Sequence, residues 1–281
     1  MITDFVKSNP NYYIKEFKKI GSKPTYSFSF NLFAFILGPV WFGMRNVWNW
    51  TLAFLIIETF SVVQIIRGLF GASGLVGSHV LNQLISNNSY SKIKLFVRSS
   101  IDISDPKIEI IQTDFNNLEN HREDIKGDDC FFCIGTTKQN SPDKSEYRRV
   151  ELEVPKQIAQ IAKSNSVNSF VFISSGYADP KSSGDYLKFK GEVEEELKRL
   201  NFPKLGIMRP SFLLGDRKEK RVGEKIGIFV FKLLSPLFLG PLKKMKPIHS
   251  ATVAKAMIKT ANENLEKNIF ESNEIAELVL N

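Results

Sequence analysis

The run Gly71-Ala-Ser-Gly-Leu-Val-Gly77 constrains the fold of this chain more than any other stretch. Its glycines recur every third residue, and an apolar pattern typical of a helix follows over residues 77–86. Such a turn lets backbone N–H groups approach a pyrophosphate and lets the helix pack close to its strand. The N-terminus of the helix, with its free N–H groups and dipole, favours the anion. The run therefore predicts a nucleotide-binding turn formed by Gly71, Ser73, Gly74, Leu75, Val76 and Gly77.

Strand-like and helical stretches alternate after this turn. Short β-rich stretches cover residues 93–97, 107–113, 129–134, 169–174 and 205–208, and helical patterns cover 151–164 and 185–200. This alternation predicts an α/β fold, a Rossmann-type doubly wound parallel sheet with helices on both faces. The expected first strand, residues 65–70, is irregular because it contains Arg67 and Gly68. Either it completes the sheet, or it is too short and leaves the cofactor domain inactive.

The N-terminal region has a different composition. Two apolar runs, residues 28–44 and 51–66, are joined by a segment rich in tryptophan, and lysines precede them. A helix needs about 20 apolar residues to cross a bilayer, and tryptophans favour its interfaces. We expect residues 1–66 to form a two-helix membrane hairpin, followed by an NAD(P)-binding domain over residues 67–281. The alternatives are a soluble helical hairpin or a segment lying in the interface, because Glu58 interrupts the second run.

The lysines ahead of the hairpin favour a cytoplasmic N-terminus. We therefore expect the protein in the inner, cytoplasmic membrane of a bacterium, with its catalytic domain facing the cytoplasm. The stretch Phe30-Asn-Leu-Phe-Ala-Phe-Ile-Leu-Gly-Pro-Val-Trp-Phe42 resembles a small family of bacterial membrane domains of unknown function that carry the pattern F-N-x-x-A-F-x-x-G-P-x-W. This resemblance covers roughly the first seventy residues. It implies a membrane location and says nothing about chemistry.

The charge and the cysteines exclude several classes of function. A net charge of +8 is compatible with nucleic acid, anionic lipid or a phosphate-bearing cofactor. No zinc-finger or aromatic RNA-binding motif is present, so we expect no nucleic-acid partner. Cys130 and Cys133 lie three apart in an apparent strand and would point to opposite faces, as core residues rather than a redox pair. The histidines show no metal-ligand spacing, so we expect no metal; they are His79, His121 and His249.

Residues at the expected strand ends indicate which dinucleotide binds. In NAD enzymes an acidic residue near the end of the second strand binds the ribose 2′-hydroxyl, whereas this chain has Arg98 and Ser99 there. A guanidinium suits a 2′-phosphate, which favours NADP over NAD. Asp114 either accepts a hydrogen bond from the adenine amino group or is an ordinary turn residue. Gly135 and Thr136 would let the backbone of the fourth strand lie against the cofactor.

A group of polar residues after the fifth strand predicts acid–base chemistry. Ser174 and Ser175 end that strand, and Tyr186 and Lys190 follow four residues apart, on one face of the expected helix. A nearby ammonium stabilises a phenolate, which suits a phenol to proton transfer. A serine hydroxyl can hold a substrate carbonyl beside the phenol. The alternative is a surface pair on an amphipathic helix.

From about residue 68 onward the chain resembles the short-chain dehydrogenase/reductase superfamily, and more narrowly its atypical Tat-interacting-protein reductase type. The matching segments are the glycine turn, Phe172-Ile-Ser-Ser175, Tyr186-Leu-Lys-Phe-Lys-Gly-Glu-Val193, Met208-Arg-Pro-Ser-Phe-Leu-Leu-Gly-Asp216 and Lys246-Pro-Ile-His-Ser-Ala-Thr-Val-Ala-Lys-Ala-Met257. The resemblance implies NADP binding and a catalytic centre of Ser175, Tyr186 and Lys190, with Lys190 also holding the nicotinamide ribose. Only eleven positions separate Ser175 from Tyr186, so Ser174 is the alternative serine.

The sequence thus predicts a membrane-anchored, NADP-dependent oxidoreductase that transfers a hydride between nicotinamide and a carbonyl or alcohol substrate. The alternative is a non-catalytic NADP-binding module that senses redox state. The apolar segment 226–241 falls where the superfamily forms its substrate lid. It suggests an apolar substrate, such as a lipid or a quinone-like molecule, or is an internal packing helix.

Overall fold

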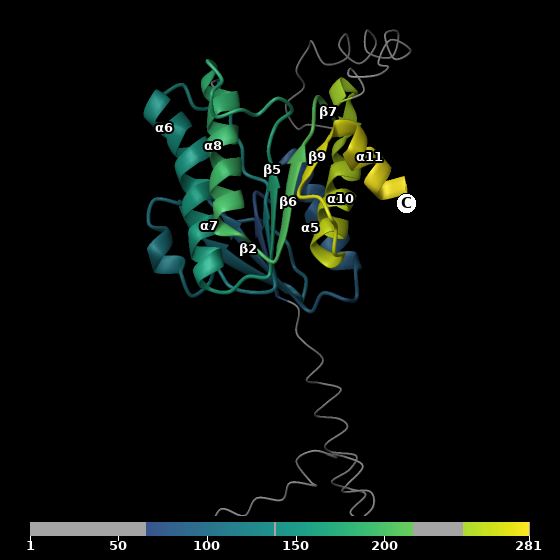
Figure 1. Ribbon diagram of the computed structural model, residues 1–281. Coiled ribbons are helices and arrows are strands. Elements are labelled where there is room, and N and C mark those ends of the chain that lie inside the picture. The colour runs from purple at the N-terminus through teal and green to yellow at the C-terminus, as the bar shows by residue number, and fades with distance from the viewer. Residues whose placement is uncertain (1–65, 138, 216–243, 281) are drawn as a thin grey trace, which may run out of the picture. The chain divides into compact units, whose positions relative to one another are not determined.

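A computed structural model describes residues 66–137, 139–215 and 244–280 (Figure 1). The described residues belong to one compact unit of the chain, Ile65–Asn281. The hairpin expected in the N-terminal region and the expected lid, residues 226–241, lie outside the described residues.

Among the described residues, a parallel sheet of seven strands forms the centre of this unit, in the order β3-β2-β1-β4-β5-β6-β9. The strands are β1 (Ile66–Phe70), β2 (Lys92–Val97), β3 (Ile108–Gln112), β4 (Asp129–Phe132), β5 (Ser169–Ile173), β6 (Lys204–Arg209) and β9 (Ile269–Glu271). The chain runs outward from β1 to β3 and then returns to β4 on the other side of β1. Ligands of such sheets bind at this switch point, beyond the carboxyl ends of the strands. The predicted α/β doubly wound fold is confirmed.

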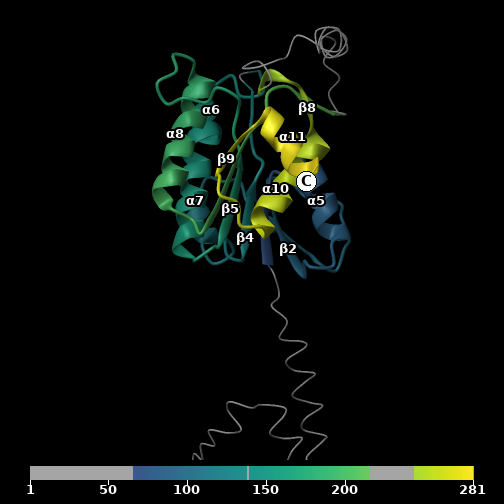
Figure 2. The same cartoon turned by 45° about the vertical axis from the view of Figure 1, so that its right-hand side comes forward.

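Helices cover both faces of the sheet (Figures 1 and 2). One face carries α5 (Leu75–Ser86), α10 (Ser250–Asn262) and α11 (Ser272–Leu280). The other carries α6 (Lys144–Arg148), the π-helical turn η2 (Arg149–Glu153), α7 (Val154–Ser164) and α8 (Asp185–Leu200). The 3₁₀ turn η1 (Leu118–His121) and a small pair of strands, β7 (Leu213–Leu214) and β8 (Ile248–His249), complete the described elements.

Aromatic side chains fill the core between the sheet and the α7–α8 layer. Phe70 and Phe96 stack with ring centroids 4.2 Å apart, and Phe132 and Phe172 lie 5.8 Å apart. Strands buried on both faces read as continuous apolar runs, which is why the sequence shows them clearly. Cys130 packs in this core, whereas Cys133 packs against the core of the opposite face. Both thiols are free, so their prediction as core residues on opposite faces is confirmed.

The irregular first strand is complete. Every residue of β1 has a partner on β2, and all but the first also have one on β4. Arg67 is tolerated in the sheet because its buried guanidinium forms an ion pair with Asp129 on β4. It also lies 4.3 Å from the ring centroid of Tyr90 and donates to Asn262. The alternative of a truncated first strand is therefore wrong, because the neighbouring strand supplies the opposite charge.

Candidate active site

The glycine turn has the tight geometry that its spacing predicts. Gly71 has a φ of +87°, and the Gly74 N–H donates to its carbonyl at 3.0 Å. A Cβ on Gly71 would lie 2.8 Å from the carbonyl carbon of Cys133. A Cβ on Gly77 would lie 2.1 Å from the Gly71 carbonyl oxygen. Both positions thus require glycine. The turn brings the backbone close to the start of α5, where Leu75 and the buried Val76 begin the helix.

A cleft of about 280 Å³ opens at the carboxyl ends of β1, β2 and β4. Seven of the predicted cofactor-binding residues line it: Gly71, Ser73, Gly74, Arg98, Ser99, Gly135 and Thr136. Helix α5 begins beside it, as expected for a site that receives a pyrophosphate. The bare backbone of the glycine turn, which lines the cleft, fits the pyrophosphate of a dinucleotide.

Other residues line the cleft that sequence reasoning did not identify. They include the apolar side chains of Ile101 and Phe115 and the polar side chains of Asn140, Ser141 and Arg149. Apolar walls with a few polar groups are typical of nucleotide sites. Nothing in the sequence pattern marks these residues, because they come from loops and from η2 and meet only in the folded chain.

Asp114 is not among the residues that line the cleft. Its carboxylate accepts hydrogen bonds from the backbone N–H of Asn116 at 2.9 Å and from the Asn116 side chain at 2.8 Å. These bonds, the backbone one first, lower the pKa of Asp114. These contacts with Asn116 have the geometry of an ordinary turn. Its neighbour Phe115, at a φ of +63°, lines the cleft instead.

The two serines after β5 have different surroundings. Ser174 is buried, and its hydroxyl donates to Glu194 Oε1 at 2.5 Å. Arg209 holds that carboxylate through two further hydrogen bonds. Ser175 is half-buried, and its hydroxyl makes one long contact of 3.4 Å, to the carbonyl of Gly176. The hydroxyl of Ser174 thus has a structural partner, whereas that of Ser175 is available to a ligand.

Tyr186 and Lys190 lie one turn apart at the start of α8. The Tyr186 side chain is 38% exposed, whereas Lys190 is buried. The ammonium of Lys190 lies 6.0 Å from the centroid of the Tyr186 ring and donates to the carbonyl of Ile173, at the end of β5. The phenol therefore faces solvent with a fixed positive charge beneath it. The predicted common face is present.

Glu151 completes this arrangement, although the sequence analysis did not identify it. Its Oε2 lies 3.0 Å from Lys190 Nζ, and its Oε1 accepts the backbone N–H of Thr136. Burial by itself would lower the pKa of Lys190, but the charge of Glu151, with those of Tyr186 and Glu194, raises it above the ordinary lysine value. The Lys190 ammonium therefore stays charged. The Glu151 carboxylate connects it to Thr136, which lines the cleft.

Tyr147, on α6, lies close to the same group. Burial raises its pKa to about 12, and the charges of Glu151, Tyr186 and Asp185 add to that effect. Its ring packs against Phe189 with centroids 6.1 Å apart. Tyr147 is thus a neutral core phenol, unlike the exposed Tyr186.

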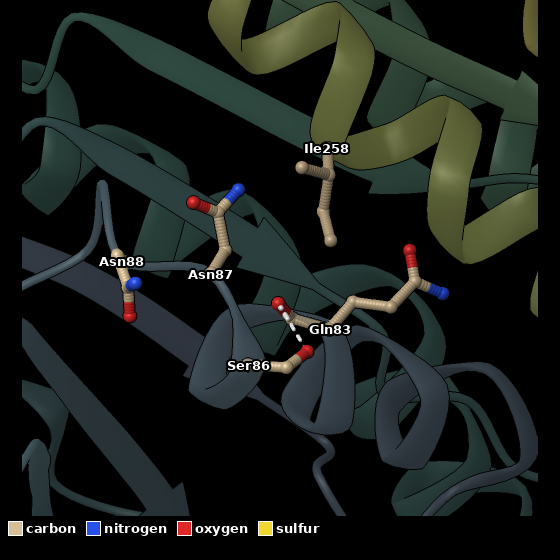
Figure 3. A pocket seen from close by; sticks show the side chains of 5 residues that line it. All are labelled: Gln83, Ser86, Asn87, Asn88 and Ile258. Atoms are coloured by element: carbon tan, nitrogen blue, oxygen red, sulfur yellow. Dashed lines mark hydrogen bonds between the residues drawn. The ribbon is translucent and has the colours of Figure 1, made fainter.

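A second hollow lies elsewhere on the surface (Figure 3). It measures about 420 Å³ and is lined by Gln83, Ser86, Asn87, Asn88 and Ile258, around the end of α5 and against α10. It is wide open to solvent and contains none of the predicted site residues. We assign the candidate site to the cleft because the glycine turn and the strand ends meet there.

The three histidines lie on different elements: His79 on α5, His121 on η1 and His249 on β8. Over the described ranges, no group of three or more His, Cys, Asp or Glu side chains is placed to hold a metal ion.

Comparison with known proteins identifies the family of this domain. A family described as NAD(P)H-binding matches residues 71–264. A family of unknown function, DUF2628, matches residues 4–87. The second match supports the expectation of a family of unknown function in the N-terminal region, but it does not support a membrane domain there.

Curated relatives cover the same domain. The chain is 30% identical to Protein FMP52-1, mitochondrial, of Scheffersomyces stipitis, over 75% of this chain and 96% of the relative. It is 33% identical to Protein HTATIP2 of Rattus norvegicus, over 56% of this chain and 66% of the relative. The predicted likeness to a Tat-interacting-protein reductase domain is therefore confirmed. Among solved structures, the Bordetella bronchiseptica enzyme WbmH in complex with NAD⁺ is similar in fold, with a TM-score of 0.56 and 15% identity, over 74% of this chain and 75% of that one.

These relatives correct the expected location. Besides FMP52-1, five further relatives are named mitochondrial. In the part of the chain that the structure describes, no helix is both long and apolar enough to cross a membrane. Because these relatives are named mitochondrial, the expected location in a bacterial inner membrane, with the catalytic domain facing the cytoplasm, is wrong. The sequence analysis inferred it from apolar runs that lie outside the described residues.

Proposed function

Because this chain belongs to the NAD(P)H-binding family, we propose that it is an NADP-dependent oxidoreductase of the short-chain dehydrogenase/reductase type, acting on a carbonyl or alcohol substrate. One observation carries the proposal. The exposed phenol of Tyr186 lies over the buried ammonium of Lys190, and Glu151 connects that ammonium to Thr136 at the cofactor cleft. Acid–base and cofactor-binding groups thus lie within one connected set of contacts.

The cofactor would lie along the cleft, with its pyrophosphate on the glycine turn between Gly71 and Gly77. Arg98 and Ser99 would bind its 2′-phosphate, because a guanidinium pairs with phosphate through two charge-assisted hydrogen bonds. This pairing is what favours NADP over NAD. Lys190 would hold the nicotinamide ribose. When bound, the nicotinamide supplies or accepts the hydride.

The remaining roles fall to side chains of the β5–α8 region. Tyr186 would give a proton to the substrate oxygen during carbonyl reduction and take one during alcohol oxidation. Lys190 would keep its positive charge beside the phenol, because Glu151 holds the ammonium in its charged state. Ser175 would donate a hydrogen bond to the substrate oxygen and so orient it. Ser174 is not suited to this role because Glu194 engages its hydroxyl.

An apolar substrate and a membrane attachment through residues 1–66 extend the proposal. Both rest on the apolar sequence of segments outside the described residues. Flotation of the purified chain with phospholipid vesicles would test the attachment: we expect the chain to rise with the vesicles, and a chain that stays in the dense fraction would contradict it.

Titration of the purified chain with NADPH and NADH, followed by cofactor fluorescence, tests the function. We expect micromolar binding with NADPH preferred, and then oxidation of NADPH with members of a panel of aldehydes and ketones. Absence of binding to either cofactor would overturn the proposal. Tight binding without turnover of any substrate would favour the non-catalytic, redox-sensing alternative.

A further inference from the structure

Arg149, the first residue of η2, lies at the cofactor cleft but is engaged by the carboxylate of Glu146 on the preceding α6. Its Nε lies 2.8 Å from Glu146 Oε2, and its Nη2 lies 2.8 Å from Glu146 Oε1. Arg149 Nη1 donates to the carbonyl of Phe115 at 3.3 Å. The side chain is 27% exposed and lines the cleft, so the paired guanidinium is accessible to a ligand there.

Arg98 lies near the same carboxylate. It lines the cleft together with Arg149, although the two residues come from different parts of the chain. The pKa of Glu146 is lowered first by its hydrogen bonds with Arg149, and the charge of Arg98 adds to this effect. The Glu146 carboxylate is therefore bound by the Arg149 guanidinium and lies within electrostatic reach of the Arg98 guanidinium. Asp114 also lies within electrostatic reach of Arg149, but Asn116 engages its oxygens.

We propose that Arg149 is a second ligand of the cofactor's 2′-phosphate. When no such phosphate is present, the Glu146 carboxylate pairs with the Arg149 guanidinium instead. A phosphate carries more charge and more acceptor oxygens than a carboxylate, and it pairs with guanidinium in the same forked geometry. Replacement of the Glu146 carboxylate by the 2′-phosphate as the partner of Arg149 therefore favours binding of NADPH. NADH brings no phosphate to this position, so Arg149 keeps its pair with Glu146. The inference rests on the proposed function and assigns a specificity role to two residues beyond Arg98.

Fluorescence titration of the full chain with NADPH and with NADH tests this inference. Replacing Arg149 with alanine should weaken NADPH binding about tenfold or more, the cost of losing hydrogen bonds to a charged group. It should change NADH binding less than about twofold, because NADH lacks that group. Glu146→Gln should strengthen NADPH binding about threefold, in the range measured for exposed ion pairs, and leave NADH binding unchanged.

Arg148 provides the matched control. It is the neighbouring arginine, but it pairs with Glu153, lies over the ring of Phe189 and is not among the residues that line the cleft. Arg148→Ala should leave the affinities for both cofactors unchanged. Arg149→Lys keeps the charge and loses the fork, so its loss of NADPH affinity should be intermediate. It also serves as the test variant if Arg149→Ala does not fold.

The outcomes separate this inference from the proposed function. Failure of the wild-type chain to bind either cofactor overturns both. Wild-type preference for NADPH, combined with unchanged binding in Arg149→Ala and Glu146→Gln, overturns this inference alone. Equal weakening of NADPH and NADH binding in Arg149→Ala also overturns this inference, because the guanidinium would then contact the part of the cofactor that NADPH and NADH share.

Discussion

Lys190 Nζ and Glu151 Oε2 lie 3.0 Å apart, and both side chains are buried. Loss of one partner from a buried ion pair leaves an uncompensated charge, which costs about 3–5 kcal/mol. We predict that Glu151→Gln, which keeps the shape of the side chain, lowers the free energy of unfolding by about that amount. Urea denaturation measures it. Glu153→Gln, an exposed residue two positions along, is the control and should change stability by less than about 1 kcal/mol.

The same pair predicts a pH dependence of stability. The pKa of Lys190 in the folded chain is raised above its ordinary value. Its stabilising contribution is therefore fully present below the unfolded value, about 10.4, and is lost as pH rises through the raised folded value. The difference in unfolding free energy between the wild-type chain and Glu151→Gln should be constant around neutral pH and shrink in this alkaline range. A difference that does not change with pH would contradict the pairing.

Tyr186→Phe should separate binding from chemistry. The substitution removes the proton-transferring hydroxyl and keeps the ring over Lys190. We predict a fall in turnover of about a thousandfold, typical for loss of a general acid–base group, with the NADPH dissociation constant unchanged within about twofold. Steady-state kinetics and fluorescence titration measure the two quantities. Tyr177→Phe, at another exposed tyrosine, is the control, and an equal fall in both variants would argue against the role of Tyr186.

The adjacent serines should respond in opposite ways. Ser175→Ala should lower turnover about a hundredfold, as for loss of a donor to a reacting oxygen, with little change in stability. Ser174→Ala should destabilise the chain by about 2 kcal/mol, because Glu194 then loses a buried donor. Thermal unfolding measures the stability of both variants and steady-state kinetics measures their turnover. Each variant is the control for the other. The reverse pattern would transfer the catalytic role to Ser174.

Gly77→Ala should disrupt the turn. The added Cβ would lie 2.1 Å from the Gly71 carbonyl oxygen, in backbone that cannot move without opening the turn. We predict destabilisation of about 3 kcal/mol, the upper part of the usual range for overpacking, together with loss of cofactor binding. Gly184→Ala, where the nearest atom would be 3.9 Å away, is the matched control and should be tolerated. Normal NADPH affinity in Gly77→Ala would show that the turn does not bind the pyrophosphate.

Several elements could be predicted closely from the sequence. The range expected for α8, residues 185–200, is the one observed. The helix expected at 151–164 is the last part of a continuous helical run, α6–η2–α7, that begins at Lys144. Asp143 caps this run by accepting from the N–H groups of Ser145 and Glu146. The C-terminal elements α10, β9 and α11 were not predicted. A helix cap depends on a single side chain, and the position of the C-terminal elements depends on contacts with distant parts of the chain. Hydrophobic periodicity indicates neither the cap nor these contacts.

The sequence by itself determined the glycine turn, the alternation of strands and helices that predicts a parallel sheet, and the common face of Tyr186 and Lys190. Each is a local property, since glycine spacing, strand alternation and helical period depend on neighbouring residues. Tertiary structure alone decided that Glu151 pairs with Lys190, that Asp129 neutralises Arg67 and that Glu146 engages Arg149 beside Arg98. In the first two cases a buried charge needs a partner, and only the folded chain brings together residues far apart in sequence. Glu146 and Arg149 are sequence neighbours, but only the fold places them at the cleft with Arg98.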